Sequence, residues 1–262
     1  MAELLRFYAE AGYNEALDEQ PIDRLTQPAP VPSTQRAAPS ATAAERPRPA
    51  APAQAAVPDE QQAALARQLA REARTLEELR SQLQGFDGCN LKFTAKNLVF
   101  ADGNPEAPIM FVGEAPGRDE DIEGLPFVGR SGRLLDMMMA AIGLDRTSAY
   151  ISNVIPWRPP GNRDPSPLET EICRPFIERH IELVNPKVLV TLGNPSTKLL
   201  LRTTTGIMRL RGNWQVHVTP SGAEIPTMPT LHPAYLLRNP AHKKLAWRDF
   251  MEIRARLNDL PA

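Results

Sequence analysis

Cysteine is nearly missing from this sequence, which has two in 262 residues, Cys89 and Cys173. Two thiols cannot by themselves supply the four thiolates of the usual iron–sulfur cluster or of an all-cysteine zinc site. Long apolar runs are missing too, since no stretch approaches the roughly 20 residues that span a bilayer. The N-terminus is acidic and lacks the basic-then-apolar pattern of a signal peptide. These absences predict a cytoplasmic protein with no membrane partner and with both cysteines buried and reduced.

An excess of charge of either sign is also missing, because 30 basic and 31 acidic residues give a formal net charge of -1. The charge is nevertheless uneven. Residues 202–247 have few acidic side chains and carry a group of basic ones: Arg202, Arg209, Arg211, Arg238, Lys243 and Lys244. Contacts with phosphates need local positive charge, not a basic total. The charge pattern therefore permits nucleic-acid binding without demonstrating it.

Proline and alanine dominate residues 26–58, where large apolar side chains are almost absent. Such a segment buries too little apolar surface to offset the entropy of ordering, so we expect a disordered linker. Residues 1–25 have apolar side chains at helical spacing, which fits either a loosely attached helix or a docking peptide for an unidentified partner. The folded domain is then 59–262, with a helix over 59–84 and a core of about 86–258.

Four apolar segments with strand character alternate with amphipathic helical segments in this domain. The expected strands lie in 108–116, 149–157, 187–193 and 226–235. The expected helices cover 132–144, 166–184, 194–202 and 243–258. This alternation predicts an α/β fold with three layers, α/β/α, around a central, mostly parallel four-stranded sheet. In such sheets the ligand site lies at the carboxyl ends of the strands.

Three of the expected strands end in unusual tails. They read GEAPGRDEDIEGLPFVGRSG over 113–132, NVIPWRPPGNR over 153–163 and LHPAYLLRNP over 231–240. The first is not a phosphate loop, because no Gly-Lys-Ser/Thr follows, and it lacks the spacing of a dinucleotide fingerprint. Together the tails bring a carboxylate, an amide and an imidazole to one edge of the sheet.

In order and spacing, these three motifs resemble those of the family-four uracil-DNA glycosylases, over roughly residues 86–258. The resemblance implies a monomeric, monofunctional enzyme that hydrolyses the N-glycosidic bond of uracil in single- or double-stranded DNA and so begins base-excision repair. Its setting would be the cytoplasm and nucleoid. Two alternatives remain open: a non-catalytic uracil- or DNA-binding module of the same fold, and a glycosylase that also accepts other deaminated bases.

The resemblance assigns roles to residues of the motifs. Phe127 would stack on the flipped uracil and Asn153 would bond its N3 and O4 edge, in a pocket that Gly113 and Ala115 help to form. His232 would donate a hydrogen bond to the uracil O2 as negative charge develops there. Ala115 stands where the best-known branch of the superfamily has an aspartate. Positioning of water is therefore expected from Glu120 and Asn162, ahead of Glu114, which we expect to be mainly pocket-forming.

The resemblance also implies contacts with DNA. Either Leu236 or Leu237 would wedge into the space left by the flipped base, with Arg238 on a phosphate. Arg158 and Arg163 of the second motif are further candidates for DNA contacts. The alternative for the two leucines is that they pack at the start of the final helix.

The chain departs from the family pattern at its cysteines. Family-four members have a C-x-x-C pair near the start of the core and two more cysteines around the second motif. In this chain the four positions read Phe86, Cys89, Trp157 and Cys173. Because two ligands are replaced by large apolar side chains, the sequence predicts that the iron–sulfur cluster is absent and that no cofactor or metal is bound.

Overall fold

The computed structural model describes residues 59–260. The helix expected over 1–25 and the linker expected over 26–58 lie outside this range. The helix expected over 59–84 is two helices, α2 (Asp59–Glu72) and α3 (Leu76–Gly85). The second begins where the Thr75 side chain accepts a hydrogen bond of 3.1 Å from the backbone N–H of Glu78. None of the helices described in 59–260 is both long and apolar enough to cross a membrane.

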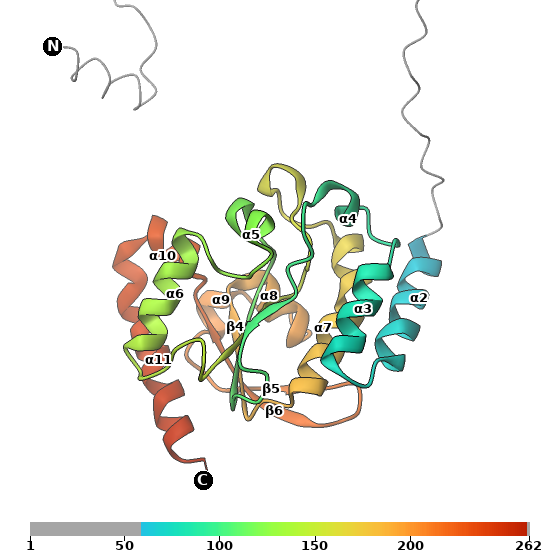
Figure 1. The fold of residues 1–262 in the computed structure, drawn as a ribbon. Helices are drawn as coiled ribbons and strands as arrows, with labels where there is room; N and C mark the ends of the chain where they lie inside the picture. The colour runs from blue at the N-terminus through green and yellow to red at the C-terminus, as the bar shows by residue number, and fades with distance from the viewer. Residues whose placement is uncertain (1–58, 261–262) are drawn as a thin grey trace, which may run out of the picture. The chain divides into compact units, whose positions relative to one another are not determined.

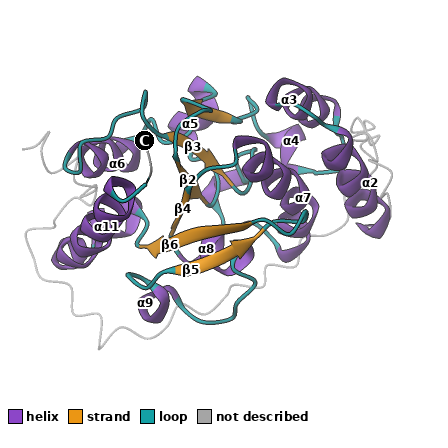
Figure 2. Cartoon of the chain, turned by 90° about the horizontal axis from the view of Figure 1, so that it is seen from below, coloured by secondary structure: helices purple, strands orange, loops and turns teal. Residues whose placement is uncertain are grey.

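The central sheet has six strands in the order β1-β3-β2-β4-β6-β5. The four inner strands are β3 (Tyr150–Asn153), β2 (Ile109–Gly113), β4 (Val188–Leu192) and β6 (Glu224–Thr230), and all pair in parallel. This confirms the predicted α/β class and the four parallel strands. Two edge strands were not predicted, β1 (Ala101–Gly103) and β5 (Gln215–Val218), and both pair antiparallel with their neighbours. Figure 2 shows β5 beside β6.

Helices cover both faces of the sheet (Figure 1). One face carries α6 (Arg130–Ala140) and α11 (Lys243–Asn258), and the other carries α2, α3 and α7 (Pro167–Val184). Side chains of β2 alternate between the two layers. Ile109 and Phe111 are buried with residues of α6 and α11, whereas Met110 and Val112 are buried with residues of α2, α3 and α7. The strand is buried on both faces, as a central parallel strand must be.

The remaining elements are short and lie in the connections. They are α4 (Leu91–Thr94), α5 (Arg118–Glu123), α8 (Asn194–Leu200), α9 (Ile207–Leu210), α10 (Pro233–Arg238) and the 3₁₀ turns η1 (Pro160–Asn162) and η2 (Pro240–His242). Because the four inner strands are parallel, the segments that follow them emerge at one edge of the sheet.

Candidate active site

A cleft of about 520 Å³ opens at the carboxyl ends of the four parallel strands. The segments after β2, β3, β4 and β6 all contribute to its walls. Among the lining residues are most of those that the sequence singled out: Glu114, Ala115, Glu120, Phe127, Asn153, Asn162, Arg163, His232 and Arg238. The three tails therefore meet in one concave site.

Asn153 lines the cleft from the end of β3. Its side chain is buried, with 5% of the residue exposed, and its carboxamide has no hydrogen-bond partner among the residues that the structure describes. Gly113 on the neighbouring strand leaves room for it, since a Cβ at Gly113 would lie 2.4 Å from Asn153 Oδ1 and 2.6 Å from Phe127 Cζ. An amide that lines the cleft without a protein partner can bond a ligand there.

Phe127 presents an aromatic ring beside this amide. Its backbone lies in the left-handed region at φ 56°, which is uncommon for a phenylalanine. The ring centroid lies 5.5 Å from that of His232, with the two planes inclined by 32°. An aromatic face, an amide and an imidazole therefore surround one space, which is the set of groups that can stack on a flat heterocycle and bond its edge.

His232 follows β6 and caps α10. Its Nδ1 accepts a hydrogen bond of 3.1 Å from the backbone N–H of Ala234, so in the neutral ring the proton resides on Nε2. Burial, together with the positive charge of Arg238, lowers the pKa of His232 to about 4. Gly193, at φ 92°, permits the close approach, because a Cβ there would lie 2.9 Å from His232 Cβ. The imidazole is thus a neutral donor at ordinary pH.

Glu120 lies at the cleft wall, but its carboxylate is already engaged. One oxygen accepts from the backbone N–H groups of Val128 and Gly129, at 3.1 and 3.0 Å, and the other accepts from Gly117 at 3.1 Å. Only 7% of the residue is exposed. These contacts make Glu120 a brace for the loop beside it, which argues against the expected role in positioning water.

Glu114 is the less engaged carboxylate. It is half-buried at the end of β2, and its carboxylate has no hydrogen-bond partner within residues 59–260. Burial and the nearby charge of Asp164 raise the pKa of Glu114. Asn162 is exposed at the rim, where its Oδ1 accepts a 2.6 Å hydrogen bond from Arg158 Nε. The geometry therefore reverses the expected order and favours Glu114 over Glu120 and Asn162.

The two candidate wedge leucines differ in exposure. Leu236 is 1% exposed and packs in a core cluster with Leu134, Leu231 and Ala246, so it cannot insert into DNA. Leu237 is half-buried, and the neighbouring Arg238 is exposed at the mouth of the cleft. Of the other arginines, Arg163 is held by both oxygens of Glu169, at 2.8 and 2.6 Å.

Part of the cleft comes from segments that the sequence did not single out. Gly193, Asn194 and Pro195 follow β4 and line the site, as do Ile207 and Met208 of α9. The first three could have been found, since a glycine and a proline after a buried parallel strand is the same signal that marked the other tails. Asp164, which also lines the cleft and acts on Glu114, gave no signal in the sequence.

Comparisons with known proteins agree with this geometry. Residues 100–251 match the Uracil DNA glycosylase superfamily. The chain is 42% identical over 185 residues to a type-4 uracil-DNA glycosylase of Sulfurisphaera tokodaii, covering 69% of this chain and 84% of that protein. It is 39% identical over 183 residues to the type-4 uracil-DNA glycosylase of Archaeoglobus fulgidus, covering 68% and 92%. That of Thermotoga maritima is 41% identical over 155 residues, covering 58% and 77%.

These relatives correct one prediction, that the protein is free of a cofactor. Type-4 glycosylases are iron–sulfur proteins. The low cysteine count of this chain therefore does not establish that a cluster is absent. Cys89 and Cys173 are both buried, and their sulfurs lie 4.0 Å apart. They supply two thiolates of a four-thiolate set, and the described residues hold no group of three or more His, Cys, Asp or Glu that could bind a metal.

Proposed function

This chain belongs to the Uracil DNA glycosylase superfamily, and we propose that it excises uracil from DNA in the cleft at the carboxyl ends of its parallel strands. It is a hydrolase of N-glycosyl bonds whose product is an abasic site, and the reaction begins base-excision repair. The observation that carries the proposal is the carboxamide of Asn153, which lines the cleft beside the ring of Phe127 and has no hydrogen-bond partner within residues 59–260.

Recognition starts with a base that has left the helix, since an enzyme of this kind reads a flipped nucleotide. The ring of Phe127 supplies a stacking platform. Asn153 offers one acceptor and two donors, which complement the N3–H donor and the O4 acceptor of uracil. Gly113 keeps the two side chains close enough to act on one base.

Cleavage of the glycosidic bond leaves negative charge on uracil and positive charge on the sugar. The Nε2–H of His232 would donate to uracil O2 as that charge develops, and it needs no change of protonation to do so. Glu114 would orient the attacking water and accept its proton. Its negative charge would also stabilise the sugar cation. Glu120 has no place in this sequence of steps beyond holding the loop.

Uracil-containing and matched thymine-containing oligonucleotides, single- and double-stranded, provide the test. We expect strand breaks after alkali only with uracil, and free uracil in the supernatant. Retained binding with no released base would instead favour a non-catalytic module of the same fold. Release of hypoxanthine or xanthine from parallel substrates would show a wider range of bases.

Asp164→Asn is expected to let excision persist to lower pH. Asp164 raises the pKa of Glu114, so the Glu114 carboxylate is fully charged only above that raised value. Removing the like charge lowers the pKa, and the acid limb of the kcat/KM profile, which reports groups of the free enzyme, moves to lower pH. The pKa of His232, about 4, lies below this limb in the unmodified protein.

The matched control for this experiment is Asp259→Asn, which removes an exposed carboxylate after the last helix. It should leave the profile unchanged. An acid limb that stays in place in Asp164→Asn would remove Glu114 from the water-positioning role.

Leu237→Ala is expected to slow excision from double-stranded DNA about tenfold and to change single-stranded DNA less, since a wedge helps only where a base must leave a stack. Leu236→Ala, one residue earlier, should instead lower the free energy of unfolding by about 2–5 kcal/mol through a core cavity. Single-turnover excision and thermal unfolding of both variants check this. Equal losses on both kinds of DNA in Leu237→Ala would rule out the wedge.

A further inference from the structure

The loop that carries Phe127 is held in an unusual backbone conformation. A left-handed φ of 56° is unfavourable for a non-glycine residue, and it persists only where the surroundings enforce it. On one side the brace is Glu120, which accepts from the N–H groups of Val128 and Gly129. Those contacts fix the backbone after Phe127. The carbonyl groups of Pro126 and Phe127 are held by a different side chain.

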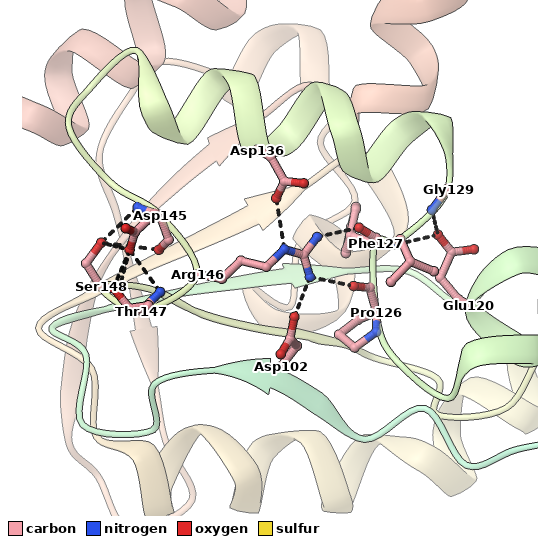
Figure 3. A network of polar contacts seen from close by, with 11 residues as sticks. Asp102, Glu120, Pro126, Phe127, Gly129, Asp136, Asp145, Arg146, Thr147 and Ser148 are labelled. Carbon is pink, nitrogen blue, oxygen red and sulfur yellow. Dashed lines mark hydrogen bonds and ion pairs between the residues drawn. The ribbon is translucent and has the colours of Figure 1, made fainter.

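That side chain belongs to Arg146, which lies in the connection between α6 and β3 (Figure 3). Its guanidinium donates to two successive carbonyl oxygens, that of Pro126 at 3.1 Å and that of Phe127. The Phe127 carbonyl is also pressed against α6, because a Cβ at Gly132 would lie 1.7 Å from that oxygen. The peptide group that orients Phe127 is thus fixed between a cation and a helix.

Two carboxylates hold the guanidinium in place. Asp102 of β1 accepts from Nη1 at 2.5 Å, and Asp136 of α6 accepts from Nε at 2.9 Å. The Arg146 side chain is 26% exposed, so its charge is partly withdrawn from water, and the two acids compensate it. A planar guanidinium fixed by two acids presents its remaining N–H groups in set directions. Arg146 therefore connects the sheet edge and α6 to the backbone of the cleft.

We propose that Arg146 is a positioning residue for base recognition, which orients the Phe127 ring through the Phe127 carbonyl. The inference rests on the proposed function, in which that ring stacks on uracil. Neither Arg146 nor its two carboxylates lines the cleft, so the effect reaches the substrate only through the loop. A lysine can replace it only in part, because an ammonium keeps the charge but lacks the planar fork that contacts two carbonyls while paired with two acids.

The test compares Arg146→Gln, Arg146→Lys, Phe127→Ala and the double variant Phe127→Ala/Arg146→Gln. The measurements are single-turnover excision from a single-stranded uracil oligonucleotide and the inhibition constant for free uracil. We expect Arg146→Gln to slow excision by up to about 10²-fold, as small displacements of a positioned group do, and to weaken inhibition by uracil. Arg146→Lys should fall between it and the unmodified protein.

The double variant separates positioning from general stability. If Arg146 acts through the ring, then Arg146→Gln should cost less than about threefold once Phe127 is alanine, because the two changes are coupled. Additive losses would overturn the proposal, as would unaltered excision and inhibition in Arg146→Gln. No excision by the unmodified protein would instead reject the proposed function itself.

Arg179→Gln is the matched control. Arg179 is also 26% exposed, pairs with Glu182 at 3.0 Å and donates to the carbonyl of Ala73 at 2.9 and 2.8 Å, away from the cleft. It should lower the unfolding temperature as Arg146→Gln does, while excision by the folded protein stays unchanged. Equal losses of excision in the two variants would show that the effect of Arg146 is stability alone.

Discussion

His232→Ala is expected to lower the single-turnover rate of uracil excision by about 10²–10³-fold, the cost of one donor to a developing oxyanion. The reason is the fixed tautomer. The Ala234 N–H occupies Nδ1, so Nε2 carries the proton toward the cleft. Because the pKa of His232 is about 4, the ring is already neutral at pH 5, and this group should add no pH dependence above that. Binding of uracil-containing DNA should weaken far less than the rate.

A second variant separates donation from capping, since alanine also removes the N-cap of α10. Asparagine is a good N-cap, so His232→Asn should keep the helix start and the unfolding temperature. Its shorter side chain does not carry a donor to the position of Nε2, and the rate should fall as in His232→Ala. Excision by His232→Asn at the unmodified rate would reject the role of His232 in stabilising the leaving group.

Most of the fold could be predicted, because its inner elements are long and periodic. The helix α11 has the predicted bounds, Lys243–Asn258, and α7, Pro167–Val184, begins one residue inside the predicted 166–184. The edge strands β1 and β5 could not be predicted in this way. The first has three residues, and the second alternates with its valines exposed and the polar His217 buried, so neither shows a buried apolar face. Pairing makes both of them strands: β1 pairs with β3, far along the chain, whereas β5 forms a hairpin with β6, which follows it directly.

The cleft could be placed from sequence, but the tasks of its residues could not all be assigned. Strand ends located Asn153 and His232, since parallel strands send their tails to one edge. The sequence favours Glu120 as the residue that positions water, because the residue type and the motif indicate only an acidic side chain near the site. Its three contacts with backbone N–H groups depend on how the loop folds back. Arg146 gave no signal for the same reason, because its partners lie on β1, α6 and the Phe127 loop.

Asn153→Asp is expected to reduce uracil excision by about 10²–10³-fold and to create weak excision of cytosine. A carboxylate would still accept from uracil N3–H, but its second oxygen would face O4, so an attraction becomes a repulsion between acceptors in a buried site. Cytosine reverses the pattern, with an acceptor at N3 and a donor at the exocyclic amine. A protonated aspartic acid matches that pattern, and burial favours the protonated form. Cytosine excision should therefore rise as the pH falls.

Two further variants make the result decisive. Asn153→Leu has similar volume and no polar group, so it should lose uracil excision without gaining activity on cytosine. Asn258→Asp places the same change on the exposed end of α11, where both activities should match the unmodified protein. Release of uracil and cytosine from single-stranded oligonucleotides, followed across pH, is the measurement. Unchanged uracil kinetics in Asn153→Leu would mean that this carboxamide does not read the base, and the unpartnered amide would need another ligand.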